Sequence, residues 1–89
     1  MRSKQEVDKF IDEASSVLQV IIKAMVDNPT KASLMIDIGE NTIQFITNVD
    51  KSDTGKIIGK QGKNAAAIRN MLTAMAAKHG FRAVLVINE

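Results

Sequence analysis

One nine-residue stretch, Gly55-Lys56-Ile57-Ile58-Gly59-Lys60-Gln61-Gly62-Lys63, constrains this chain more than any other part of its sequence. Glycines at both corners of the turn leave no Cβ to keep another molecule away from the backbone. A helix-forming run, residues 64–79, follows directly, so the turn opens onto unpaired N–H groups at the positive end of a helix dipole. Three lysines add charge on the same side: Lys56, Lys60 and Lys63. The stretch therefore predicts a site for a phosphate backbone.

The spacing of the glycines excludes the common nucleotide-binding loops. A P-loop needs four residues between its glycines and then Lys with Ser or Thr. Gly55 and Gly59 have three residues between them, and Lys63 is followed by Asn64. A dinucleotide-binding loop needs a single residue between its first two glycines. What remains is a Gly-x-x-Gly turn between two helices, which by itself is more typical of a simple helix–helix corner.

Periodicity predicts the elements on the N-terminal side of this turn. Apolar residues recur at intervals of three and four from Val7 to Met25, which indicates a long amphipathic helix. Ser3 and Glu6 fit a capping box at its start, and Pro29 ends it. The first half of so long a helix is expected to project beyond the core. Two alternating runs, 32–38 and 42–49, flank a Gly-containing turn and predict a β-hairpin.

The remaining elements complete an αββααβ order. Ser52 or Asp53 is expected to cap a short helix that ends at Ile58. A second long helix over 64–78 and a last strand over 81–88 follow, with Gly80 between them as the helix stop. We predict an α+β fold in which the helices cover one face of a three-stranded sheet.

Charge and composition limit the classes of function. Residues 1–50 carry five Lys/Arg against eight Asp/Glu, whereas residues 51–89 carry seven against two, which favours an anionic partner for the second part. The chain has no cysteine and no apolar run of about 20 residues, so we expect no disulfide, no membrane insertion and a cytoplasmic protein. No nucleophile–base pair or second metal ligand accompanies His79, so we expect neither an enzyme nor a metal or other cofactor.

The run Ile57–Gly62, followed by Ala65 and Ile68, resembles the signature of KH domains, whose Gly-x-x-Gly loop clamps about four single-stranded nucleotides. The helix-first order resembles the type II form of that fold. Residues 17–88, including Val26-Asp27-Asn28-Pro29, resemble the small bacterial single-KH RNA-binding proteins of the KhpA type. We therefore expect the KH domain over 17–89 and a helical extension, continuous with the first helix, over 1–16.

The resemblance implies a single-stranded RNA-binding protein of the RNA chaperone or post-transcriptional regulator type. Gly59 and Gly62 would admit the phosphates, with Lys60 and Gln61 against the backbone. Aliphatic residues would line a groove for the bases, since the chain has three Phe and no Trp or Tyr for stacking. The implied site residues are Lys56, Ile58, Gly59, Lys60, Gln61, Gly62, Lys63, Asn64, Ala65 and Ile68. The alternative for the lysines is a solvated charged rim, although the turn places them together and favours contact. Ile58 and Ile68 can belong to the core and also line the groove. Arg69 and Arg82 are as readily solvated as in contact with RNA.

The chain has more apolar residues on its first helix and its strands than a single core would bury, which predicts protein partners. The first helix carries two apolar seams, one from Val7 to Ala24 and one from Ile11 to Met25. Both can be buried in a wide interface with the sheet, but we expect one of them to meet a second chain in a homodimer. Met35, Ile46, Val84 and Val86 are expected to form a second patch on the outer sheet face. The resemblance implies a further partner, a larger multidomain KH protein of the Jag (KhpB) type. The rival interpretation is a protein-interaction module that uses the KH fold as scaffold and the long first helix as its working surface.

Overall fold

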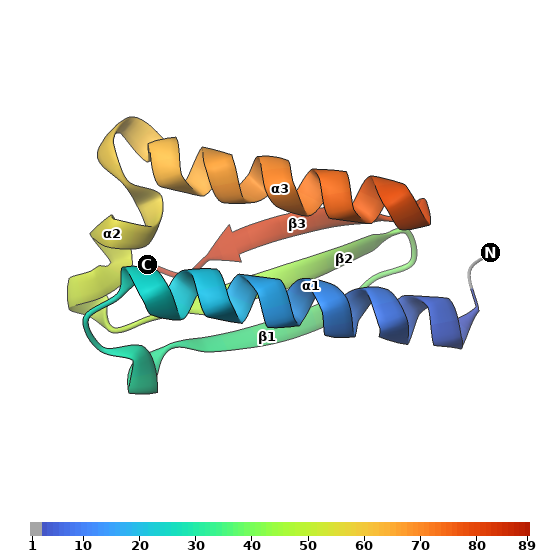
Figure 1. Ribbon diagram of the computed structural model, residues 1–89, viewed down its shortest axis with the longest axis horizontal. Coiled ribbons are helices and arrows are strands. Elements are labelled where there is room, and N and C mark those ends of the chain that lie inside the picture. The colour runs from blue at the N-terminus through green and yellow to red at the C-terminus, as the bar shows by residue number, and fades with distance from the viewer. Residues whose placement is uncertain (1–2) are drawn as a thin grey trace.

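Two long helices lie side by side on one face of a three-stranded sheet, and a short helix closes one end (Figure 1). The computed structural model describes residues 3–89. The helices are α1 (Lys4–Met25), α2 (Thr54–Ile58) and α3 (Lys63–His79), and the strands are β1 (Ser33–Ile38), β2 (Thr42–Asn48) and β3 (Arg82–Ile87). The predicted αββααβ order, the α+β class and the type II KH-like arrangement are confirmed.

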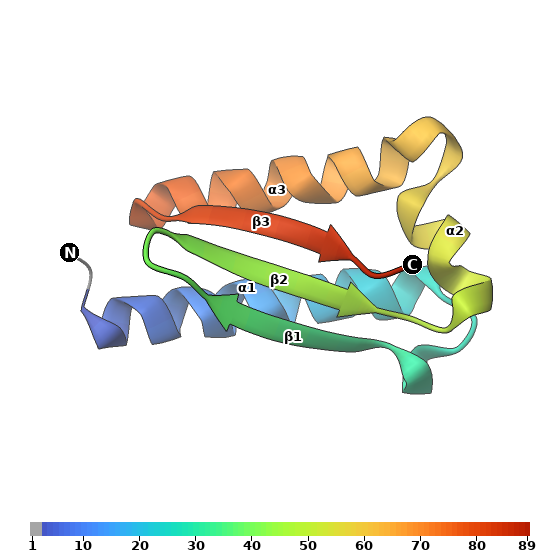
Figure 2. The same cartoon turned by 180° about the vertical axis from the view of Figure 1, so that it is seen from behind.

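The sheet has the order β1-β2-β3, with β1 antiparallel and β3 parallel to the central strand. The predicted hairpin is confirmed, and the N–H of Gly39 closes it by donating to the carbonyl of Thr42 at 2.8 Å. Seen from behind, the opposite face of the sheet carries no helix (Figure 2). Met35, Ile46 and Val86 are register partners across all three strands, so they form one apolar row on that face.

Helix α1 buries one stripe against the rest of the domain, from Phe10 to Ile22. The predicted capping box is present, since the side chains of Ser3 and Glu6 each bond the other residue's backbone N–H. Phe10 is only 1 % exposed and its ring stacks on Phe81 with centroids 5.3 Å apart. The prediction that the first half of the helix projects beyond the core is therefore wrong. The buried stripe combines members of both predicted seams: Phe10, Ala14, Leu18 and Ile22.

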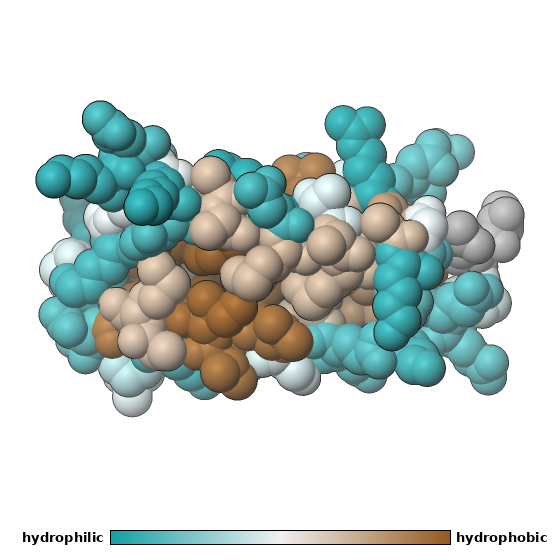
Figure 3. All heavy atoms as spheres, turned by 45° about the horizontal axis from the view of Figure 1, so that its top comes forward, coloured by the Kyte–Doolittle hydropathy of each residue, from teal (hydrophilic) through white to brown (hydrophobic). Residues whose placement is uncertain are grey.

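Part of the helical face remains apolar and exposed. Val17, Val20 and Met71 have 42, 69 and 43 % of their surfaces accessible. A view onto the helices shows apolar residues gathered across the middle of this face, with hydrophilic side chains around them (Figure 3). Among residues 3–89, no helix has the length and hydropathy that a membrane span requires.

Candidate nucleic-acid interface

The Gly-x-x-Gly turn lies where α2 ends and α3 begins, and its backbone adopts conformations that suit glycine. Gly59 has φ 77° and ψ 173°, and Gly62 has φ 75° and ψ 13°. Gln61, between them, is the one non-glycine residue in the described chain with positive φ, at 57°. The turn is held by N–H bonds from Gly59 to the carbonyl of Gly55 at 2.8 Å and from Gly62 to that of Gly59 at 3.1 Å. Three of the four residues from Gly59 to Gly62 have positive φ, a conformation that favours glycine, which explains why the sequence needs glycine here.

The two glycines face different surroundings. A Cβ added to Gly59 would lie 2.6 Å from Asn64 Cγ and 2.8 Å from the Asn64 backbone nitrogen, closer than atoms can pack. A Cβ added to Gly62 would meet no atom within 4 Å. Gly59 is therefore needed for the turn to close on α3, while Gly62 leaves an open approach to the backbone.

Asn64 holds the turn from within. Its side-chain Nδ2 donates to the carbonyl of Lys56 at 2.8 Å, which links the first turn of α3 to α2. The side chain is half-buried, so the amide is committed to the protein. Asn64 therefore acts as a positioning residue for the turn between Gly59 and Gly62.

The three predicted lysines are not equivalent. Lys60 and Lys63 are exposed, and neither forms an ion pair with any residue of the described chain. Lys56 Nζ lies 3.3 Å from a carboxylate oxygen of Asp27 and 3.4 Å from one of Asp53. Its hydrogen bond to Asp27 and the charge of that carboxylate raise the pKa of Lys56 above the ordinary lysine value. The charge of Lys56 is thus balanced within the protein, whereas those of Lys60 and Lys63 are available to a ligand.

Asp53 is a structural residue that the sequence interpretation misassigned. Its side chain is fully buried and accepts hydrogen bonds from the backbone N–H groups of Asp27 at 3.1 Å and Asn28 at 3.0 Å. Burial alone would raise the pKa of this carboxyl, but the two backbone donors, the Asn28 side chain and Lys56 together hold it below the ordinary value. Asp53 occupies the N-cap position of α2, as one of the two expected residues, but the expectation that its side chain caps the helix is wrong, since no side chain bonds the N–H groups at the start of α2.

The predicted aliphatic residues divide between surface and core. Ile58 is half-buried beside the turn, whereas Ala65 and Ile68 each expose only 3 % of their surfaces. Ile68 packs in the core with Ile57, Leu72 and Leu85. Around the turn, the structure therefore brings together Ile58, Gly59, Lys60, Gln61, Gly62 and Lys63, with Asn64 behind them and Ala65 and Ile68 beneath.

The single histidine lies at the other end of α3, away from the turn. His79 Nε2 is 3.3 Å from a carboxylate oxygen of Glu13, and its ring centroid is 5.5 Å from that of Phe10. Within residues 3–89, no three His, Asp or Glu side chains come together as a metal-binding group. His79 is thus explained by its packing between α1 and α3.

Comparison of the sequence with known proteins identifies its family. The family model described as the KhpA/KhpB KH domain matches residues 15–87. The RNA-binding protein KhpA of Aquifex aeolicus is 41 % identical over 73 residues, which cover 82 % of this chain and 92 % of that protein. Those of Chlamydia trachomatis and Borreliella burgdorferi are 40 % and 39 % identical over 72 and 71 residues, covering 81 % and 80 % of this chain and 92 % and 87 % of theirs. The chain therefore belongs to the KhpA/KhpB family of KH-domain proteins.

Proposed function

We propose that this protein binds single-stranded RNA, with the phosphates lying against the turn between Gly59 and Gly62. The observation that carries the proposal is the open side of Gly62 next to two lysines, Lys60 and Lys63, that have no partner among the described residues. The N–H groups of Gly62 and Lys63 donate to the carbonyls of Gly59 and Lys60, so the start of α3, which no side chain caps, would contribute the positive end of its helix dipole. The relatives whose sequences match are named RNA-binding proteins, which supports the same ligand.

The contact would depend on charge more than on the identity of the bases. Lys60 and Lys63 supply two positive charges, and the Gln61 amide adds a hydrogen-bond donor beside them. Phe10 and Phe45 are 1 % and 0 % exposed and their rings lie 5.9 Å apart, so these rings cannot stack on bases. We therefore expect modest affinity, little sequence preference and a shallow salt dependence of about one to two released counterions.

A single charge placed on the turn tests the proposal. Gly62→Asp adds a carboxylate where there is open space, whereas Gly59→Asp would collide with Asn64 and confuse binding with folding. We expect Gly62→Asp and Lys60→Glu each to weaken binding of a fluorescent dodecamer RNA about tenfold or more, because a carboxylate repels the phosphates. Lys23→Glu, which changes an exposed lysine on α1, is the matched control. Affinity equal to the control, in variants with the wild-type circular dichroism spectrum, would refute RNA binding at the turn.

The cellular role is proposed on the same basis. A small protein that binds RNA weakly and with little preference suits the role of an RNA chaperone or post-transcriptional regulator, acting in the cytoplasm where bacterial RNA is made. Two modules acting together would bind one strand more tightly than either alone. A second copy of the chain, or a larger multidomain KH protein of the Jag (KhpB) type, would supply the second module.

Self-association is a second candidate function, and the exposed apolar surface of the helices favours it. Val17 and Val20 on α1 and Met71 on α3 leave about half of their surfaces in water, and such patches are typical of interfaces. We expect sedimentation analysis to show a dimer that Val20→Lys converts to a monomer. Loss of the dimer with unchanged binding of a tetranucleotide would separate self-association from RNA contact. A wild-type protein that stays monomeric at high micromolar concentration would exclude this candidate.

A further inference from the structure

Strand β1 forms one edge of the sheet, and the outer side of its backbone is open. It has a neighbouring strand on one side only, and among residues 3–89 no helix or strand lies along its other side (Figure 2). Met35 and Ile38 each expose 57 % of their surfaces. Edge strands are commonly protected by a proline, a bulge or several charges, whereas β1 carries a single charge, Asp37. This edge therefore has the character of an interface.

Backbone hydrogen-bonding groups point outward at every second residue of β1. The N–H of Gly39 donates to the carbonyl of Thr42, and from this bond the odd-numbered residues of β1 are the ones that bond to β2. The N–H and C=O groups of Leu34, Ile36 and Ile38 therefore point away from the sheet, and no other part of the described chain bonds to them. Such a row, repeating at about 6.8 Å, matches the backbone of one more strand.

The side chains of these three residues face the helices, and a small hollow lies beside the first of them. It has a volume of about 90 Å³ between α1 and β1, and its lining includes Ile22, Ala32 and Leu34. That is about three times the volume of a water molecule in the liquid, which suits one side chain of the size of valine. Opposed residues of an antiparallel pair share a face, so an added strand would direct the side chain opposite Leu34 toward this hollow.

Asp37 defines the charge that a partner strand should carry. It is exposed on the face of the sheet away from the helices, and it forms no ion pair with any residue from 3 to 89. Its register partner on β2 is Gln44, which is uncharged. A cation directly opposite Asp37 across the free edge would therefore be stabilised by this carboxylate.

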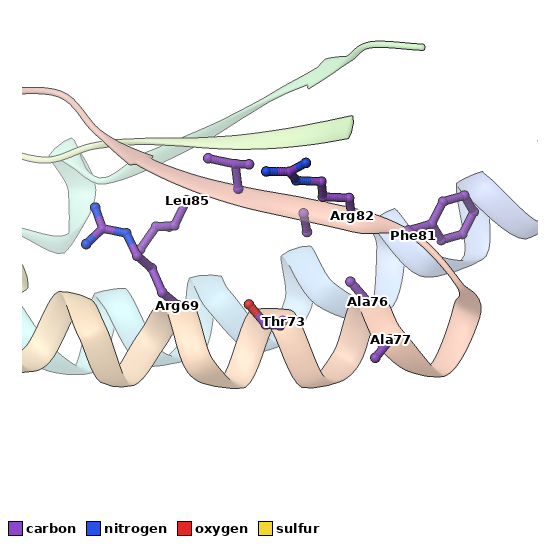
Figure 4. A pocket seen from close by; sticks show the side chains of 9 residues that line it. Arg69, Thr73, Ala76, Ala77, Phe81, Arg82 and Leu85 are labelled. Atoms are coloured by element: carbon purple, nitrogen blue, oxygen red, sulfur yellow. The ribbon is translucent and has the colours of Figure 1, made fainter. Parts of the chain in front are cut away.

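The other edge of the sheet has a different chemistry. Arg69 extends from α3 toward β3, while the Arg82 side chain lies along that strand (Figure 4). Both side chains are exposed, so the edge at β3 is strongly charged where that at β1 is apolar. An apolar extended segment with one cation therefore fits β1 and not β3.

A second copy of the chain fits the β1 edge poorly. Helix α1 packs against β1, and α3 packs against β3 (Figure 1). Two copies joined through β1 would have these strands about 4.8 Å apart, with both α1 helices on the same side of the joined sheet. Packed helices need about 8–10 Å between their axes, so the two helices would collide. A segment without a helix above it has the room that a second copy lacks.

We propose that β1 is a docking edge for an extended peptide segment of a partner protein, which joins the sheet as a fourth, antiparallel strand. The segment carries aliphatic side chains opposite Leu34, Ile36 and Ile38 and a lysine or arginine opposite Asp37. Its backbone bonds the outward N–H and C=O groups of the same three aliphatic residues.

A designed peptide tests the proposal. The probe is the fluorescein-labelled hexapeptide Val-Lys-Val-Thr-Val-Thr, which places its lysine opposite Asp37 when its last valine lies opposite Leu34. N-methylation of the three valines removes the N–H groups that face β1, and we expect it to weaken binding about tenfold or more in fluorescence polarisation. N-methylation of the lysine and the two threonines removes N–H groups that face away, so this matched control should change binding less than about twofold.

Charge reversal tests the register. We expect glutamate in place of the probe's lysine to weaken binding about three- to fivefold, and Asp37→Lys to weaken the original probe by a similar factor. Combining the two changes should restore binding, because the pair is then attractive again. Asp12→Lys, which reverses an exposed charge on α1, is the matched control. With saturating probe, amide hydrogen exchange should slow at Leu34, Ile36 and Ile38 but not at Met35, which already bonds to β2.

Several results would overturn the proposal. Equal losses for the two methylation patterns would show that the probe does not add as a strand, and no binding at about 1 mM probe would show that the edge takes no peptide. Displacement of the probe by a uridine dodecamer would assign the edge to nucleic acid, and a dimer that the probe converts to monomer would assign it to a second copy. Gly62→Asp should leave probe binding unchanged, so the edge and the turn can fail independently.

Discussion

The buried carboxylate of Asp53 accepts the backbone N–H of Asn28 at 3.0 Å, across 25 residues of sequence. It accepts the N–H of Asp27 at 3.1 Å with its other oxygen. These bonds satisfy the backbone where α1 has just ended, and they fix the residue that immediately precedes α2. Since α2 leads directly into the turn at Gly59, we infer that this one side chain helps to fix the position of the Gly-x-x-Gly turn.

We predict that Asp53→Asn lowers the melting temperature by roughly 5–10 °C, because an amide offers one acceptor in place of two and leaves a buried N–H unpaired. RNA affinity should fall as well, although Asp53 touches no ligand, because the turn loses its anchor. Differential scanning fluorimetry and RNA titration measure the two effects. Asp37→Asn, on the exposed strand β1, is the control and should change neither quantity. A variant with the wild-type melting temperature would show that the Asp53 bonds do not hold the turn.

The same carboxylate predicts how stability depends on pH. The pKa of Asp53 is held below its ordinary value of 3.8, so its contribution to stability is complete above that value and is lost as the pH falls through the folded-state pKa. The difference in melting temperature between wild type and Asp53→Asn should therefore be constant near neutral pH and should narrow below about pH 4. Both proteins keep Asp50, whose pKa is also lowered, so its effect cancels. A difference that stays constant down to pH 3 would argue against this carboxylate as the cause.

The two glycines of the turn should respond differently to alanine. We expect Gly62→Ala to lower the free energy of unfolding by about 1 kcal/mol, because a residue with a Cβ is strained in the left-handed conformation even where open space surrounds it. Gly59→Ala should cost about 3 kcal/mol or more, because its backbone conformation is nearly restricted to glycine and the new Cβ meets Asn64. Urea unfolding of both variants measures the difference. Equal costs would mean that Asn64 moves aside easily and does not position the turn.

Thr47 provides a test of the core beneath the sheet. It is fully buried, and its hydroxyl has no hydrogen-bond partner in the described chain. Thr47→Val keeps the shape and removes the unpaired hydroxyl, so we expect the free energy of unfolding to rise by about 1 kcal/mol. Thr42→Val, at the half-buried start of the same strand, should change it little. A loss of stability on Thr47→Val would reveal a partner for the hydroxyl that forms in solution.

Local patterns were sufficient to predict the elements of the fold. The capping box at Ser3 and Glu6, the hairpin around Gly39 and the helix stop at Gly80 each depend on residues within a few positions of one another, and all three are present. The error at Asp53 has the opposite cause. Aspartate at the start of a helix is typically a cap. The carboxylate of Asp53 instead accepts two backbone N–H groups that lie 25 and 26 residues away, and no pattern of neighbouring residues could indicate those partners.

The candidate site shows the same division. Gly59 and Gly62 were identified because their spacing is local, and the structure gives each a left-handed backbone. The ion pair between Lys56 and Asp27 forms because the end of α1 meets α2. Arg69 and Arg82 line one groove because α3 packs on β3. Those tertiary relationships decide which cations are free, so the sequence alone could not separate Lys56 from Lys60.

Phe10 links the N-terminal part of α1 to the core, and its removal tests whether that part belongs to the folded domain. Its ring contacts those of Phe45 and Phe81, although it lies outside the family match that begins at residue 15. We expect Phe10→Ala to lower the free energy of unfolding by about 3–5 kcal/mol in urea titrations, and Phe10→Leu by about 1 kcal/mol, which keeps one variant folded. Lys9→Ala, at an exposed site on the same helix, should have little effect. If Phe10→Ala were as mild as Lys9→Ala, the first turns of α1 would be an appendage, and the domain would begin near residue 15 as the family match does.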